Sequence, residues 1–171
     1  LGTTPELIFI KSLNNTGNWI TYSSVTGTDY YMYLNSNAAP ADYPSDPPWT
    51  NITSTTFGIN GTFSDYNNSS TNYIAYCFTS IPGYSQIGYY IGTDVTSGNQ
   101  IYTGFKPAWL LIRNISTTKN WYIIDNKRST TNPRDKELYA NTSSTQATMN
   151  SVSFFDYGFE LVTTDSGFND I

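Results

Sequence analysis

The sequence predicts an all-β protein built from two tandem β-sandwich units of the jelly-roll or lectin-like kind. The first observation behind this prediction is composition: aromatic residues make up 16% of the chain and charged residues only 12%. Aromatic and β-branched side chains suit the pleated, half-buried surface of a strand. The second is that short apolar runs alternate with turn residues such as Asn14-Asn15-Thr16-Gly17 and Ser97-Gly98-Asn99. The third is that the chain repeats itself.

The repeat is clearest where Asn18 and Trp19 recur 102 residues later as Asn120 and Trp121. Downstream the register drifts, so that "YLNSN" around Asn35 matches "YANTS" and "FGIN" matches "YGFE". Such drift is expected, because insertions in surface loops cost little loop entropy. A period of roughly 100 residues is too long for a solenoid and predicts tandem domains. We place the first unit at residues 1–80 and the second at residues 81–171.

In the first unit, apolar runs bounded by turn residues predict five strands. They are expected at residues 7–11, 19–22, 30–34, 55–59 and 73–78. The segment "YPSDPPW", from Tyr43 to Trp49, is rich in proline, which has no amide hydrogen to donate to a ladder. We therefore expect it to form a rigid surface loop.

In the second unit, the same criteria predict six strands. They are expected at residues 86–91, 100–103, 109–113, 121–125, 137–140 and 159–163. Unit 1 shows no counterpart of the two opening strands, and unit 2 shows none of the strand at 73–78. A sheet without such a strand exposes unpaired backbone groups. We therefore expect a chain cut from a longer array, whose open edges are covered by a neighbouring copy, by another protein, or by residues before Leu1 and beyond Ile171. Self-assembly follows if identical chains do the covering.

The charge and hydropathy of the chain argue against nucleic acid and membrane as partners. The formal net charge is −5, so a phosphate backbone would be repelled. No polybasic anchor is present, and no apolar stretch approaches the ~18 residues needed to cross a bilayer.

The sequence also lacks the common catalytic residue patterns. It has no histidine, which removes Ser-His-Asp and Cys-His arrangements, and no glycine-rich phosphate-binding motif. Cys77 is the only cysteine and lies in the apolar run "YIAYCF", where we expect a buried, inert thiol. Paired carboxylates could still hydrolyse glycosides, but most acidic residues sit in turns. We therefore expect no enzymatic activity.

We expect no cofactor, and calcium is the alternative. Asp65 with Asn67, and Asp165 with Asp170, occupy equivalent places in the two units, beside Asn68 and Asn169. Ca²⁺ prefers clustered oxygen ligands on loops. The same residue types also populate turns for purely local reasons, so both interpretations stay open.

Two sets of aromatic residues are expected to play different roles. Tyr43, Trp49, Tyr89 and Tyr90 lie in loops or adjacent pairs where a ring can face solvent, so they are candidates for stacking on a glycan. Trp19 and Trp121 recur at the same place in both units, and we expect both to anchor the core.

Several segments together resemble a known protein family. They are "YIAYCFTSIPGYSQIGYYIG", "YTGFKPAWLLIRN", "NWYIIDNKR" and "LYANTS", and the first unit adds "LGTTPELIFIKS" and "TGNWITYSS". These segments resemble a tandem β-domain found in large virion proteins of marine bacteriophages, including cyanophages, where it occurs in fibre-like or appendage-like chains. The resemblance covers nearly the whole chain but implies no residue-level role. This chain departs from the usual pattern at its ends and in the "YPSDPPW" loop.

The resemblance implies a virion structural protein, such as a tail-fibre, spike or capsid-decoration domain, located in the virion or outside the cell. Its partners would be other copies of itself and other virion proteins, with host-surface glycans as a further partner in host recognition. Two alternatives remain: a carbohydrate-binding, lectin-like module, and a bacterial surface or filament subunit completed by a donated strand.

Overall fold

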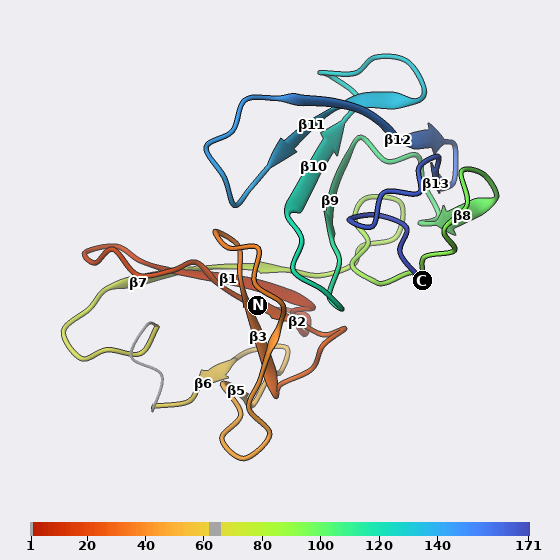
Figure 1. Cartoon of the computed structure of the whole chain (residues 1–171). Helices are drawn as coiled ribbons and strands as arrows, with labels where there is room; N and C mark the ends of the chain where they lie inside the picture. Colours follow the sequence, from red (N-terminus) through yellow and green to blue (C-terminus); the bar gives the residue numbers. More distant parts are fainter. Residues whose placement is uncertain (1, 62–65) are drawn as a thin grey trace. The chain divides into compact units, whose positions relative to one another are not determined.

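The protein is all-β in the computed structural model, which describes residues 2–61 and 66–171. The described residues form strands and turns but no helix, and hence no helix long and apolar enough to cross a membrane. The chain divides into two compact units, residues 1–80 and residues 81–171. Figure 1 traces the strands of both units.

Unit 1 contains a five-stranded sheet and a two-stranded sheet. The larger sheet has the order β4-β3-β2-β1-β7. Its strands are β1 (Leu7–Ser12), β2 (Ile20–Ser23), β3 (Tyr30–Tyr33), β4 (Ala41–Asp42) and β7 (Tyr73–Phe78). The smaller sheet pairs β5 (Trp49–Thr50) with β6 (Gly58–Ile59). All pairs are antiparallel.

Unit 2 contains one antiparallel six-stranded sheet with the order β8-β13-β12-β11-β10-β9. Its strands are β8 (Asn99–Tyr102), β9 (Trp109–Arg113), β10 (Trp121–Asp125), β11 (Arg134–Tyr139), β12 (Ala147–Phe155) and β13 (Gly158–Leu161). β9 therefore forms one edge of the sheet, beside β10 (Figure 1).

Each unit buries one face of its sheet because successive side chains of a strand point to opposite faces. In β1, Ile8 and Ile10 are buried while Leu7 and Phe9 are only partly buried. The core of unit 1 consists of Ile8, Ile10, Ile20, Tyr22, Trp49 and Tyr66. The core of unit 2 consists of Ile112, Tyr122, Ile124, Val152, Phe154, Phe159, Leu161 and Phe168.

The repeat seen in the sequence corresponds to a repeated hydrogen-bond motif, which we call the asparagine clasp. In unit 1 the Asn35 side chain accepts a hydrogen bond from the Trp19 backbone N–H at 2.9 Å and donates one to the Asn18 side chain at 2.9 Å. In unit 2 Asn141 makes the same two bonds, to the Trp121 backbone N–H at 2.8 Å and to the Asn120 side chain at 2.9 Å. The clasp is therefore present in both units, although the sequence register drifts between them.

Within each unit the clasp joins two neighbouring strands, and the pair of strands in one unit is equivalent to the pair in the other. Just beyond it, the Leu34 N–H donates to the Trp19 carbonyl at 2.9 Å, and the Ala140 N–H donates to the Trp121 carbonyl at 3.0 Å. β1, β2 and β3 of unit 1 are thus the counterparts of β9, β10 and β11 of unit 2.

One predicted strand is wrong: residues 86–91 form no strand. Side chains hold this segment in place of a ladder. The Tyr90 hydroxyl donates to the Phe168 carbonyl at 2.8 Å, and the Asn99 side-chain amide donates to the Ile91 carbonyl at 3.1 Å. The apolar residues of the segment were read as a strand, but they anchor an extended connection.

The longest strand, β12, was not predicted. Its sequence "ATMNSVSFF" begins with a mixture of apolar and polar residues, and its burial rises only from Ser151 onward. The short strands β4 and β5 were also missed. Trp49, expected in a surface loop, opens β5 and is buried.

Candidate functional site

The four aromatic residues predicted to bind a glycan do not form one surface. Tyr43 and Trp49 belong to unit 1, whereas Tyr89 and Tyr90 belong to unit 2. Tyr43 is 43% exposed and stacks on Tyr31 with a ring separation of 5.6 Å. Tyr89 is 75% exposed. These two tyrosines have the exposure that stacking on a sugar requires.

The prediction for Trp49 is wrong. Its side chain is 1% exposed, its indole N–H donates to the Tyr30 carbonyl at 3.0 Å, and its ring stacks on Tyr66 at 5.8 Å. Pairing with Ile59 in the small sheet turns the indole into the core of unit 1. Neither face of the ring is available to a ligand.

Tyr90 is half-buried and also serves the core. Its ring contacts Phe159 edge-on at 6.1 Å. Burial raises the pKa of its phenol, which stays a neutral donor to the Phe168 carbonyl. Because adjacent residues of an extended chain point in opposite directions, Tyr89 faces solvent where Tyr90 faces inward.

Of the residues predicted to bind calcium, Asp165 uses a carboxylate oxygen within a turn. Asp65 lies outside the described residues, and Asn67 is exposed and donates to the Asn60 carbonyl at 3.4 Å. Asp165 accepts from the Gly167 N–H at 2.8 Å, and Asp170 is exposed. Across residues 2–61 and 66–171, no three His, Cys, Asp or Glu side chains gather as metal ligands.

Asn169, beside that predicted calcium site, is fully buried, and its side chain forms hydrogen bonds to four other residues. Its side-chain oxygen accepts from the Thr93 N–H at 2.8 Å and from the Asn99 amide at 2.9 Å. Its amide donates to the carbonyls of Val95 at 2.7 Å and Thr163 at 2.9 Å. The asparagine thus ties the C-terminal segment to the segment before β8.

The two recurring tryptophans differ in burial. Trp121 is 4% exposed, with the Arg113 guanidinium 5.7 Å from its ring centroid. Trp19 is only half-buried and stacks on Tyr76 at 6.2 Å. We expected both to anchor the core: Trp121 is buried, whereas Trp19 is not, because the Tyr76 ring of β7 covers only part of the indole.

Glu137 carries a fully buried carboxyl group, with 0% exposure. It pairs with Ile124 and so lies on the core face of the sheet, where Ser151 donates to it and the Tyr139 hydroxyl lies 3.4 Å away. Burial raises the pKa of this carboxyl, and the charge of Asp165 raises it further. Because it faces the core, Glu137 is placed for structure and not for contact with a substrate.

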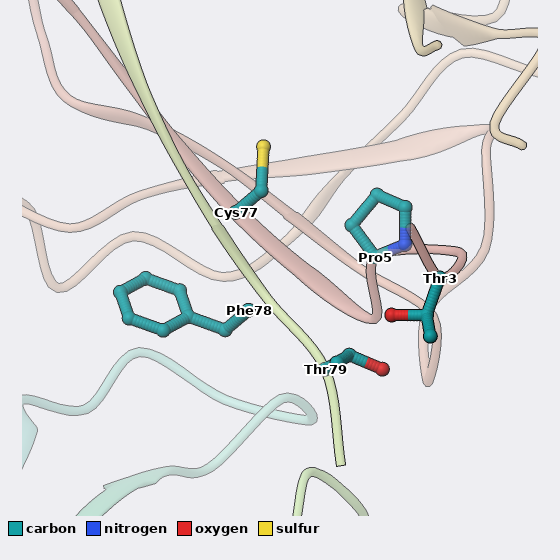
Figure 2. A pocket seen from close by; sticks show the side chains of 5 residues that line it. All are labelled: Thr3, Pro5, Cys77, Phe78 and Thr79. Atoms are coloured by element: carbon teal, nitrogen blue, oxygen red, sulfur yellow. The ribbon is translucent and has the colours of Figure 1, made fainter. Parts of the chain in front are cut away.

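A small pocket in unit 1 is lined by Thr3, Pro5, Cys77, Phe78 and Thr79 (Figure 2). Figure 2 shows the side chains of Cys77 and Phe78 on opposite sides of β7. Cys77 is half-buried, and burial raises the pKa of its thiol. The thiolate is the nucleophilic form of cysteine, and a raised pKa keeps the thiol protonated. Cys77 is therefore suited to packing and not to nucleophilic attack.

The surface of unit 2 best suited to a ligand lies on the outer face of β8, β13 and β12. Tyr102, Gly158 and Phe155 stand opposite one another across these three strands. A Cβ at Gly158 would lie 2.0 Å from the Ile101 carbonyl oxygen, so only glycine allows this close approach. The ring of Tyr102, which is 70% exposed, meets Phe155 edge-on at 5.7 Å.

Polar groups border the rings on the same face. Gln100 lies opposite Glu160 and accepts a hydrogen bond from the Tyr102 hydroxyl at 3.0 Å. Glu160 accepts from the Gly98 N–H at 2.7 Å. We call Gln100, Tyr102, Phe155 and Glu160 the β8 face. Our sequence reasoning missed it, although the alternation in "NQIY" places Gln100 and Tyr102 on one side of a strand.

Comparison with known proteins gives a family but no function. A search of curated proteins and of solved structures finds no match to this chain. A family model described as a domain of unknown function, DUF7483, matches residues 1–171. Because the match covers every residue of the sequence, including both units and both asparagine clasps, the chain belongs to the DUF7483 family.

Proposed function

We propose that this chain is a non-enzymatic structural protein of a bacteriophage virion, as a domain of a tail fibre, a spike or a capsid decoration. The observation that carries the proposal is the repeated unit, in which Asn35 and Asn141 close the same clasp on equivalent strands. Serial repetition of a β-unit extends a chain without new chemistry, as a fibre or decoration requires. The sequence resemblance to tandem β-domains of phage virions supplies the setting.

We further propose that each unit is a β-sandwich of the lectin-like kind. Each sheet buries one face, and in unit 1 a second, smaller sheet contributes Trp49 to the same core. Two sheets that share one core are the basis of a sandwich. An experimental structure in which β5 and β6 form no second layer over β1 and β2 would contradict this architecture.

The virion role is tested on particles of the phage that encodes the chain. We expect mass spectrometry of purified virions to detect its peptides at a fixed ratio to the capsid protein. Gold-labelled antibodies raised against the chain should mark one virion structure in electron micrographs. Peptides found only in the lysate, and never in purified virions, would contradict the proposal.

Carbohydrate binding is the second candidate, and the β8 face favours it. An exposed aromatic ring flanked by an amide and a carboxylate offers a stacking surface together with hydrogen-bond partners for sugar hydroxyls. The relevant groups are Tyr102, Gln100 and Glu160, all on the outer side of β8 and β13. Tyr43 and Tyr89 remain single exposed rings.

A glycan array tests this candidate. We expect specific binding by the native chain to be lost in Tyr102→Ala and retained in Tyr84→Ala. Tyr84 is the matched control, because it is 78% exposed in the same unit but lies outside the β8 face. Binding that survives Tyr102→Ala, or is lost equally in both variants, would exclude the β8 face as the glycan site.

A further inference from the structure

Glu160 supplies the carboxylate of the β8 face, and this charge has no cation bound to it. The side chain is half-buried, and one of its carboxylate oxygens accepts from the Gly98 N–H at 2.7 Å. In the part of the chain that the structure describes, no Lys or Arg forms an ion pair with it. A carboxylate that is fixed by the backbone and lacks an ion pair favours a positively charged ligand.

The charges beside the β8 face do not offset that of Glu160. Lys106 follows β8, and its ammonium group lies 3.2 Å from a carboxylate oxygen of Asp156, the residue after Phe155. These two charges compensate each other. The chain as a whole carries a formal net charge of −5, which adds to the negative potential around the face. An acidic glycan would therefore be repelled from it.

The pairing of β8 with β13 sets the distance between Glu160 and the exposed ring. Gln100 stands directly opposite Glu160. Tyr102 stands opposite Gly158, so it is a diagonal neighbour of Glu160 on the same face. Diagonal neighbours in an antiparallel pair are about 7–8 Å apart. A sugar ring stacked on Tyr102 can therefore reach the carboxylate with one of its substituents.

The surroundings of Tyr102 hold its ring in place and leave it accessible. Phe155 meets the ring edge-on at 5.7 Å, and the tyrosine hydroxyl donates to the Gln100 side chain at 3.0 Å. The tyrosine is nevertheless 70% exposed. A flat, fixed ring suits a rigid sugar ring better than a lysine side chain, which loses more rotamer freedom when it is held in one position.

We propose that the β8 face binds glycans with a free, protonated amino group, of the glucosamine type, in preference to neutral or acidic glycans. The ammonium group pairs with the Glu160 carboxylate while the sugar ring stacks on Tyr102. N-acetylation removes the charge of the amine, so an acetylated sugar loses this ion pair. The inference rests on glycan binding, the second function proposed above, and adds the class of sugar.

The test compares a glucosamine disaccharide with its N-acetylated counterpart, because the two differ only at nitrogen. Calorimetry at mildly acidic pH and low salt measures the dissociation constant of each for the 171-residue chain. Glu160→Gln removes the charge and keeps an acceptor for the Gly98 N–H. Asp94→Asn is the matched control, because it removes one negative charge at an exposed position of unit 2 outside the β8 face. The φ of 53° at Asp94 also suits asparagine.

We expect the native chain and Asp94→Asn to bind the glucosamine disaccharide about fivefold more tightly than the acetylated one. Glu160→Gln should bind the two disaccharides equally. A preference that survives Glu160→Gln would overturn the proposal. A dilysine peptide that binds as tightly as the glucosamine disaccharide would also overturn it, because the face would then recognise charge and not sugar.

The failure of this inference can be told apart from the failure of glycan binding. If the native chain binds both disaccharides equally and Tyr102→Ala binds neither, the preference for an amine is wrong and the β8 face remains a glycan site. Binding of neither disaccharide would overturn the inference as well. The glycan array then decides the second proposed function, which is wrong if the array also shows no specific binding.

Discussion

At the scale of single residues, the asparagine clasp is the clearest feature shared by the two units, because one asparagine side chain in each unit forms hydrogen bonds to two neighbouring residues. Asn141 accepts from the Trp121 backbone N–H and donates to Asn120. We expect Asn141→Ala to lower the free energy of unfolding by about 1–3 kcal/mol, since it leaves a buried donor without its partner. A urea melt measures this. Asn150→Ala, at an exposed position of β12, is the control and should change stability by less than about 0.5 kcal/mol.

Glu137 makes the stability of unit 2 depend on pH. Its carboxyl is buried, which raises its pKa above the ordinary value of 4.5, so the folded state holds this proton more tightly than the unfolded state does. Stability due to this group is therefore fully present below pH 4.5 and is lost as pH rises through the raised value.

We expect Glu137→Gln to weaken this decline, because glutamine cannot ionise. The measurement is the urea midpoint between pH 4.5 and 8 for both proteins. A midpoint that falls equally in both proteins over this range would show that other groups cause the effect.

The two tryptophans at equivalent positions should differ in stability. Trp121→Ala removes a side chain that is 4% exposed and should cost about 3–5 kcal/mol. Trp19→Ala removes a half-buried ring and should cost less. Equal losses in chemical denaturation would indicate that Trp19 is as well packed as Trp121.

At the scale of secondary-structure elements, the sequence predicts best where a short apolar run is bounded by turn residues. The strands at 73–78, 109–113 and 121–125 have the predicted bounds, because each combines β-branched or aromatic residues with a flanking turn. β12 was missed because its first half mixes apolar and polar residues and is mostly exposed, so it depends on neighbouring strands more than on its own sequence. The segment 86–91 failed for the opposite reason, since its apolar residues serve packing without a ladder.

The close packing of β8 on β13 gives a prediction for this pair of strands. A Cβ at Gly158 would meet the Ile101 carbonyl oxygen at 2.0 Å, so Gly158→Ala should force the strands apart and cost about 1–3 kcal/mol. Gly88→Ala is the control, because the nearest atom to its added Cβ would be the Gln86 side chain at 3.8 Å. A stable Gly158→Ala variant with the native exchange rates in β8 would contradict this view of the contact.

The candidate sites were harder to predict than the strands. The exposure of Tyr43 follows from its place in a proline-rich segment, and that of Tyr89 from its place beside Tyr90, since adjacent side chains of an extended segment point in opposite directions. The burial of Trp49 does not, because it depends on the two-residue pairing with Gly58–Ile59. The β8 face could not be predicted from the sequence, because it requires three strands to pair in the register that places Tyr102 and Phe155 on either side of Gly158.

At the scale of the whole molecule, the two units share one design and differ at one edge. The chain divides between residues 80 and 81. The repeat was detectable because the Asn-Trp pair and the asparagine that clasps it are needed in each unit for the same hydrogen bonds. The difference between the edges, where β1 pairs with both β2 and β7 but β9 pairs with β10 alone among the described residues, was expected from the sequence as a missing strand.

The most direct test of this shared design is residue-resolved hydrogen exchange on the chain alone. Ile10 and Ile112 face the inner partner strand in both units, so both amides should exchange slowly. Phe9 and Leu111 are also equivalent, but only Phe9 is paired with a further strand. The account predicts slow exchange at Phe9 and fast exchange at Leu111. Equal protection of Phe9 and Leu111 would contradict it.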